Sequence, residues 1–131
     1  MSISSASSAT CFGDTRVDGS TDAAFASRAI SPVHHFLAAA GLAMSDVALF
    51  VCNQSTGWFV DACRRALGLA EDRFVESFAD VANINECALL YNLVRARDAS
   101  RLKDGDVVLF YSPAAGFTRT AIVYRHREAA P

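Results

Sequence analysis

Residues 48–59 read A-L-F-V-C-N-Q-S-T-G-W-F, and this stretch decides how the chain folds. Its first half is a short apolar run that ends at Cys52, which is typical of a buried strand. Its second half begins with Ser55 and Thr56, residues that can cap a helix, so a helix is predicted over residues 56–67. In open α/β sheets, ligands bind where strands end and helices begin. The turn between the two elements is therefore the first candidate for a functional site.

The composition indicates one small domain with apolar surface to spare. The 131 residues suggest a single domain, and 52% of them are hydrophobic against 20% charged, with a mean hydropathy of +0.21. Because a small domain keeps much of its surface exposed, part of this apolar surface is expected to meet a partner. The net charge of −2 gives no electrostatic reason to expect nucleic acid. No apolar run reaches the roughly eighteen residues that a membrane span needs.

Residues 1–12 are rich in Ser and Ala and are expected to be disordered. They lack the basic and apolar regions of a secretory signal, so a cytoplasmic location with reduced thiols is expected. The cysteines show no C-x-x-C spacing, and no histidine lies three or four residues from any of them. No metal site is therefore predicted. The cysteines are Cys11, Cys52, Cys63 and Cys87.

Hydrophobic periodicity predicts one domain over residues 13–127, followed by a tail at 128–131. The predicted elements are a helix over 23–40, strands at 47–52 and 74–78, helices at 56–67 and within 83–96, and strands at 107–111 and 118–124. Pro32 either kinks the first helix or opens its second segment. The last two strands, joined by a short link, are expected to pair antiparallel. This order predicts a layered α/β unit with a mixed sheet.

Four segments carry a resemblance to a known family. They are V-D-G followed by F-A within residues 17–26, F-V-C-N-Q-S-T at 50–56, A-N-I-N-E-C-A at 82–88, and a strand–A-A-G-F-T–strand unit within 106–124. In this order they resemble the C-terminal half of the thiolase-like fold, and most nearly the β-ketoacyl-acyl carrier protein synthase III (KAS III) family. The last three segments stand where that family has P-H-Q-A-N, G-N-T-S-A-A-S and G-G-G-F-T. The resemblance covers about residues 16–126 and implies the same half-fold here.

The resemblance also implies a chemistry. In the family, a cysteine in the N-terminal half is acylated and then condensed with a second acyl thioester. The motif histidine falls on Asn53, the motif asparagine is Asn83, and the glycine that lends its backbone N–H to the oxyanion hole falls on Ala115. These groups would bind the thioester oxygen and stabilise an enolate. An asparagine amide can donate such a bond, but it cannot carry a proton near neutral pH as histidine does.

Substrate binding is implied for a second set of residues. The arginine that helps the family to bind carrier protein or CoA falls on Trp58, while Arg64 and Arg65 keep positive charge further along the same helix. Thr56 and Phe117 belong to the same motifs and complete the set. The resemblance implies no cofactor, because acyl-CoA or an acyl carrier protein thioester is the substrate.

Each candidate residue also has a purely structural explanation. Asn53 stands in a turn, where asparagine is common, and Asn83 can be a helix N-cap. Glu86 follows Asn83 by one helical turn, so the two are expected to share a face; its carboxylate can act as a base, fill the site or simply face solvent. Cys52 is either a nucleophile or a core residue.

Four functional hypotheses follow from the resemblance. The first is a KAS III-like half-protein that works with a partner chain carrying the nucleophilic cysteine, with acyl carrier protein as a further candidate partner. The second is a non-catalytic subunit or scaffold. The third is a homodimer in which two copies replace the two similar halves of the thiolase-like fold and bind an acyl ligand. The fourth is a piece of a longer enzyme.

Overall fold

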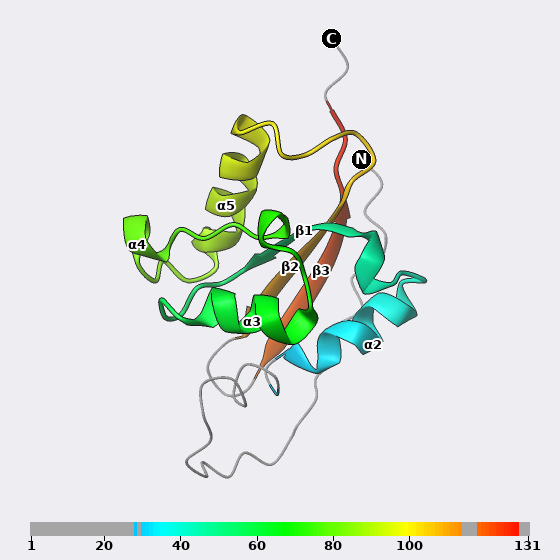
Figure 1. Ribbon diagram of the computed structural model, residues 1–131, viewed down its shortest axis with the longest axis horizontal. Coiled ribbons are helices and arrows are strands. Elements are labelled where there is room, and N and C mark those ends of the chain that lie inside the picture. The colour runs from blue at the N-terminus through cyan, green and yellow to red at the C-terminus, as the bar shows by residue number, and fades with distance from the viewer. Residues whose placement is uncertain (1–27, 29, 114–117, 129–131) are drawn as a thin grey trace.

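The computed structural model describes residues 28, 30–113 and 118–128, and it contains the predicted mixed sheet. The strands β1 (Val47–Cys52), β2 (Val107–Pro113) and β3 (Arg119–Arg125) lie in the order β1-β2-β3 (Figure 1). β1 is parallel to β2, and β3 is antiparallel to β2. The predicted α/β class and the antiparallel final pair are therefore confirmed. The predicted tail at 1–12, residues 13–27 of the predicted domain and residues 129–131 of the predicted C-terminal tail lie outside the described residues.

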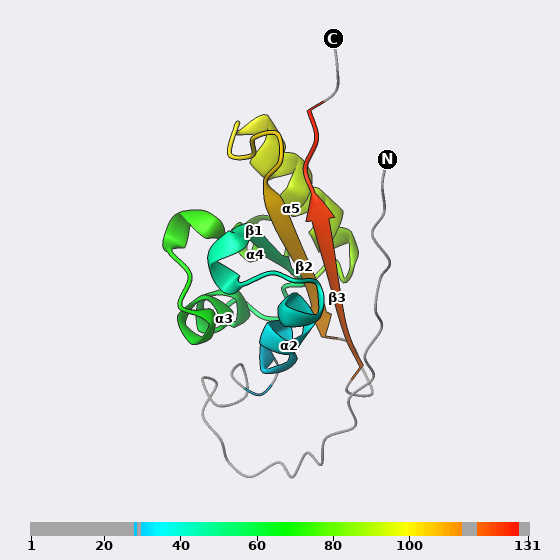
Figure 2. The same cartoon turned by 90° about the vertical axis from the view of Figure 1, so that its right-hand side faces the viewer.

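The helices cover both faces of the sheet (Figures 1 and 2). They are α2 (Pro32–Ala39), α3 (Phe59–Leu67), α4 (Phe78–Val81) and α5 (Cys87–Asp98), with 3-10 turns at Met44–Asp46 and Glu71–Arg73. Buried residues of α2 and α3 form one hydrophobic cluster with one face of the sheet. Ala96 of α5 belongs to a second cluster on the other face, against which Leu89 and Leu93 also pack. No helix in the described part of the chain is long and apolar enough to cross a membrane.

β1 is buried on both faces, which explains its unbroken apolar sequence. Phe50 and Cys52 belong to the cluster under α2 and α3, whereas Leu49 and Val51 belong to the cluster under α5. The register with β2 shifts between Val47 and Leu49. This irregularity places Val47 on the same face as Phe50, although the two are three residues apart.

Two predicted helix limits are confirmed, and one is wrong. α2 begins at Pro32, whose fixed φ and missing N–H suit the first turn of a helix. α3 ends at Gly68, which has a φ of 64°, the left-handed conformation expected of a C-cap glycine. However, α3 begins at Phe59 rather than at Thr56, and Trp58 occupies the N-cap position. Residues 55–58 form a bend and a turn before the helix, so Ser55 and Thr56 lie in this turn rather than at the helix N-cap.

The predicted strand at 74–78 is also wrong. Phe74 forms a single parallel bridge with Phe50, and the chain enters α4 at Phe78. The carbonyl of Phe74 accepts a 2.7 Å hydrogen bond from Arg101 rather than from a neighbouring strand. Side chains thus replace the strand ladder along this segment.

Candidate functional site

Asn53 stands directly after β1, at the edge of the sheet where the parallel strands end. Its backbone N–H donates to the carbonyl of Tyr111 at 3.0 Å and so continues the ladder with β2. The residue is only 5% exposed, and its side-chain Oδ1 is buried without a hydrogen-bond partner among the described residues. An unpaired buried polar group costs about 1–3 kcal/mol. The Asn53 amide is therefore packed at the strand end with hydrogen-bonding capacity unused.

Gln54 is fully buried beside Asn53, and its carboxamide makes two long-range hydrogen bonds. Nε2 donates to the carbonyl of Val75 at 2.8 Å, and Oε1 accepts from the backbone N–H of Ser77 at 2.9 Å. Gln54 is not among the site residues predicted from the sequence. The only available signal was its place inside the 50–56 motif, because both partners are more than twenty residues away in the chain.

Asn83 lies in the loop between α4 and α5, and it is exposed. Its Oδ1 accepts the backbone N–H of Asn85 at 2.9 Å, which closes a local turn. The helix N-cap explanation is wrong, because α5 begins at Cys87 and its N-cap position is Glu86. The predicted shared helix face of Asn83 and Glu86 is also wrong. Asn85 between them has a φ of 54°, so the backbone there is not helical.

Glu86 and Ser112 bring α5 to the same edge of the sheet. The Ser112 hydroxyl, near the end of β2, donates to Glu86 Oε1 at 3.4 Å. Cys52 lies opposite Tyr111 in the parallel register, so the following residues, Asn53 and Ser112, are neighbours. The structure therefore places Asn53, Ser112 and the Glu86 carboxylate together, with Asn83 in the loop leading to Glu86.

The remaining motif candidates, Ala115 and Phe117, lie outside the described residues. They fall between β2 and β3, directly beyond the end of β2. Thr56 is half-buried in the turn before α3, and its Oγ1 has no hydrogen-bond partner within the described ranges. Its predicted role as a helix cap is therefore wrong, whereas its predicted role in substrate binding stays a prediction.

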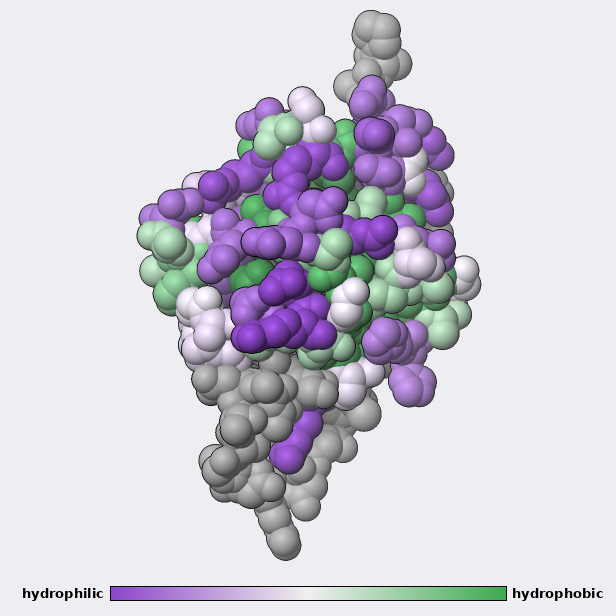
Figure 3. All heavy atoms as spheres, in the orientation of Figure 1, coloured by the Kyte–Doolittle hydropathy of each residue, from purple (hydrophilic) through white to green (hydrophobic). Residues whose placement is uncertain are grey.

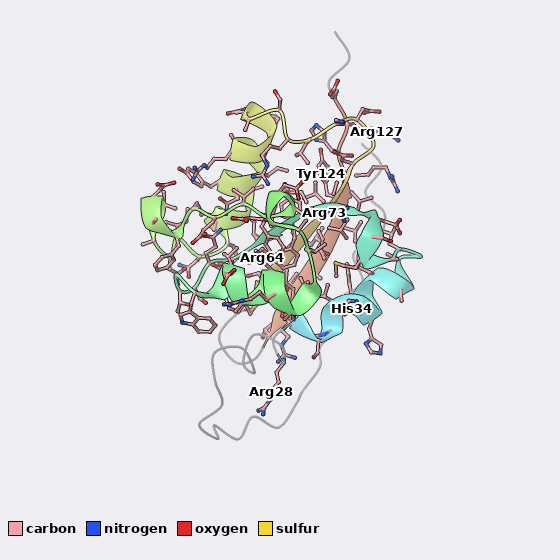
Figure 4. All side chains as sticks on the ribbon, viewed as in Figure 1. Arg28, His34, Arg64, Arg73, Tyr124 and Arg127 are labelled. Atoms are coloured by element: carbon pink, nitrogen blue, oxygen red, sulfur yellow. The ribbon has the colours of Figure 1, made fainter. Side chains whose placement is uncertain are left out.

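The basic candidates lie on α3 and away from the turn. Arg64, labelled in Figure 4, and Arg65 occupy the last turn of this helix. They form ion pairs with Asp61 at 2.8 and 2.6 Å. The hydrogen bond from Arg64 and the positive charges of both arginines lower the pKa of Asp61. Hydrophilic residues accordingly gather over α3 in Figure 3. Trp58 is 36% exposed at the start of the helix, and its ring contacts that of Phe59 edge-on at 6.0 Å.

The cysteines of the core are not poised as nucleophiles. Burial raises the pKa of the Cys52 thiol well above its ordinary value, and the neighbouring Cys63 adds to this effect. Burial also raises the pKa of Cys63 to about 12. Because the thiolate is the reactive form, the core explanation for Cys52 is supported. The described residues contain no cluster of His, Cys, Asp and Glu side chains that could hold a metal ion.

The family profile described as 3-oxoacyl-[acyl-carrier-protein (ACP)] synthase III C terminal matches residues 37–126. The chain belongs to this family. The predicted resemblance to the C-terminal half of KAS III, and with it the thiolase-like half-fold, is thereby confirmed. The matched region includes the turn at Asn53, the loop at Asn83 and the Ser112 end of β2.

Individual relatives agree with the profile. The chain is 30% identical over 86 residues to beta-ketoacyl-[acyl-carrier-protein] synthase III of Symbiobacterium thermophilum, covering 66% of this chain and 26% of the relative. It is 32% identical over 87 residues to the Mesorhizobium japonicum protein of the same name, covering 66% and 27%. The KAS III chain therefore spans about a quarter of the length of these curated relatives.

Solved structures show the same fold. The beta-ketoacyl-[acyl carrier protein] synthase III of Thermus thermophilus superposes with a TM-score of 0.75 at 32% identity, covering 82% of this chain and 34% of that chain. OleA of Xanthomonas campestris superposes with a TM-score of 0.68 at 19% identity, covering 80% of this chain and 33% of that chain. At that identity the OleA likeness concerns the fold alone.

Proposed function

We propose that this KAS III C-terminal domain takes part in acyl transfer or condensation on CoA or acyl carrier protein thioesters, with a partner chain supplying the nucleophilic cysteine. The observation that carries the proposal is the meeting of Asn53, Ser112 and Glu86 at the edge where the parallel strands end. Asn53 and Glu86 belong to the motif segments 50–56 and 82–88, and ligands in open α/β sheets bind at such edges. The matched profile describes the C-terminal part of the family, whereas the resemblance places the nucleophilic cysteine in the N-terminal part, so this proposal assigns the cysteine to a partner chain.

In this proposal the chain contributes hydrogen-bond donors. The side-chain amides of Asn53 and Asn83 and the backbone N–H of Ala115 would donate to the thioester carbonyl oxygen. Such donors stabilise the negative charge that develops on this oxygen when an enolate forms. Because amides do not titrate near neutral pH, proton transfers would fall to Glu86 or to groups of the partner and the substrate. Thr56, Trp58, Arg64, Arg65 and Phe117 are the proposed contacts of the remaining acyl, CoA or carrier-protein groups.

The outer face of α5 supports association with a partner chain. Leu90, Tyr91 and Val94 are 67%, 38% and 42% exposed, although all three are large and apolar. They lie on the same side of the sheet as Ile122 of β3, which is 42% exposed and pairs with Phe110 of the second cluster. Exposed apolar groups on one side of a small domain are typical of an interaction surface. The occupant in this proposal is a thiolase-like N-terminal half or a second copy of the chain.

A non-catalytic subunit or acyl-ligand binder is the second candidate. It is favoured by Glu86, whose carboxylate stands at the motif edge and hydrogen-bonds Ser112. A negative charge there opposes the formation of an enolate anion nearby. In either case we propose a cytoplasmic location, because the free thiol of exposed Cys87 suits a reducing compartment.

The first experiment is to purify the full chain from its own host and measure the mass of the native complex. A stoichiometric partner with a thiolase-like half is then incubated with acetyl-CoA, alone and in the complex, and acyl loading is measured by intact mass. The proposal expects loading on the partner's cysteine, and turnover that Asn83→Ala abolishes while the complex stays intact. Leu90→Lys is expected to prevent assembly without unfolding the domain. A chain that remains alone or forms only a homodimer would exclude the split-enzyme proposal and favour the binder.

A further inference from the structure

The carboxamide of Gln54 takes the place of a strand residue. In a parallel ladder, a residue donates to the carbonyl that precedes its partner and accepts from the N–H that follows it. Gln54 does this with its side chain, since it donates to the Val75 carbonyl and accepts from the Ser77 N–H. Its amide therefore stands opposite Glu76. In the register of the backbone bridge between Phe50 and Phe74, Cys52 would face Glu76. The carboxamide of Gln54 therefore occupies the place that the backbone of Cys52 would take if the ladder continued.

Only a neutral group with a donor beside an acceptor satisfies both contacts. Gln54 is fully buried, and the side-chain amide offers one donor and one acceptor side by side. An aliphatic side chain would leave two backbone groups without partners, and a carboxylate would place a second acceptor against the Val75 carbonyl. The distances of 2.8 and 2.9 Å are those of well-formed hydrogen bonds.

These two bonds connect the two motif loops. Asn53 directly precedes Gln54, and Ser77 directly precedes the short α4, which ends at the loop that carries Asn83. A second contact lies beside them, because a Cβ on Gly57 would come within 3.2 Å of the Phe78 ring. The β1–α3 turn is thus held against the start of α4 by hydrogen bonds and by close packing.

We propose that Gln54 is a positioning residue that fixes the amide of Asn53 relative to that of Asn83 through the segment 75–82. The inference rests on the proposed function only where it gives the separation of the two amides a role in catalysis. That Gln54 fixes this separation can be tested without measuring any activity. A thioester oxygen can be shared by both amides only if their separation is fixed, because catalysis by placed donors depends on preorganisation.

The test uses the full 15N-labelled chain and three variants. Gln54→Met keeps the length of the side chain and removes the amide. We expect the Ser77 amide to exchange with solvent about tenfold faster or more, relative to core amides of β2, and the resonances of residues 82–86 to shift. Val33→Ala is the matched control, because Val33 is fully buried in α2 and belongs to neither loop. It should speed exchange by global destabilisation and leave the 82–86 resonances in place.

Gln54→Glu supplies a rescue that a merely structural change would not show. When protonated, its carboxylic acid can still donate to Val75 and accept from Ser77; when ionised, it cannot donate. Burial raises the pKa of such a carboxyl above its usual value of about 4.3. We expect resonances of residues 82–86 like those of the wild type at low pH and altered ones near neutral pH. The wild type should show no such transition.

The two proposals fail separately. Unchanged Ser77 exchange and unchanged 82–86 resonances in Gln54→Met would overturn the positioning role. Acetyl-CoA is then titrated into the wild-type chain and Gln54→Met while the side-chain amide resonances of Asn53 and Asn83 are followed. Joint perturbation in the wild type, and loss of one amide's response in Gln54→Met, would support the role. If acetyl-CoA never perturbs these amide resonances in the wild type, with or without its partner, the proposed function is contradicted. The hydrogen-exchange data then still decide the role of Gln54.

Discussion

The Ser112 hydroxyl donates a 3.4 Å hydrogen bond to Glu86 Oε1, and this contact joins the end of β2 to the start of α5. It holds a carboxylate beside Asn53, at the edge where the motif loops meet. Ser112 is buried, whereas Glu86 is exposed, so the carboxylate lies at the boundary between the sheet edge and solvent. The charge of Glu86 is therefore a variable that can be changed without disturbing the core.

Glu86→Gln is expected to strengthen the binding of acetyl-CoA. The substitution keeps an acceptor for Ser112 and removes a negative charge near a site proposed for an anionic ligand. We expect the dissociation constant to fall by a factor of about two to five at low salt and the difference to vanish near 1 M salt, where the Debye length is about 3 Å. Titration calorimetry measures both values. Glu71→Gln, a change of equal charge on a distant 3-10 turn, should have no such effect.

Ala82→Gly is expected to stabilise the fold. Ala82 has a φ of 52° and a ψ of −150°, a conformation that glycine adopts readily and that costs other residues of order 1–3 kcal/mol. Glycine loses more chain entropy on folding, which offsets part of this gain. We expect a net increase of about 1 kcal/mol in the free energy of unfolding, measured by urea denaturation.

Ala79→Gly is the control for this substitution. Ala79 is exposed within α4, where the backbone is helical. The same change of residue there should lower the free energy of unfolding by about 0.5–1 kcal/mol. If both variants lose stability, the positive φ of Ala82 is not strained.

The stability of the domain is expected to fall in alkaline solution. The pKa of Cys63 is raised to about 12 in the folded state, while an unfolded thiol titrates near 8.5. The contribution of the neutral thiol is therefore fully present below about pH 8.5 and is lost as the pH rises towards 12. In that window each such group lowers stability by about 1.4 kcal/mol per pH unit. Cys52 and Tyr111 act in the same direction, because burial raises both of their pKa values.

Urea denaturation between pH 8 and pH 10 measures this slope. Cys63→Ala should unfold more easily at every pH, since it leaves a cavity, but its stability should depend less steeply on pH. Equal slopes in the wild type and the variant would show that the Cys63 thiol ionises in the folded protein. Alkylation at pH 8 gives an independent check: Cys87, which is exposed, should react in the native state, whereas Cys52 and Cys63 should not.

The elements with local signals could be predicted from the sequence. The unbroken apolar run of β1 reflects the burial of both of its faces. Gly68 marks the end of α3 because a C-cap in the left-handed conformation favours glycine. The start of α3 could not be predicted in this way. Ser55 and Thr56 have the chemistry of a helix cap, but they lie in the bend that precedes the helix.

The candidate site was found by its motifs, whereas its internal contacts were not. Gln54 bonds residues 21 and 23 positions away, and nothing near it in the sequence encodes those partners. The prediction that Asn83 and Glu86 share a helix face was wrong, because Asn85 between them adopts a positive φ, which is uncommon for residues other than glycine. Asn85 lies in the loop between α4 and α5, and no local pattern in the sequence marks its positive φ.

Asn92 provides a last prediction about the layer between α5 and the sheet. It is fully buried, and neither Nδ2 nor Oδ1 has a hydrogen-bond partner in the part of the chain that the structure describes. Ala88 and Ala96, one turn before and after it, are also buried, so this side of α5 packs closely. Asn92→Leu has a similar volume and removes two unpaired polar groups, and it should raise the free energy of unfolding by about 1–3 kcal/mol. Asn92→Ala should gain less, because it leaves a cavity. If Asn92→Leu instead destabilises the protein in urea denaturation, the amide has a hydrogen-bond partner such as an ordered water. In that case the polar side chain of Asn92 contributes to the stability of this layer.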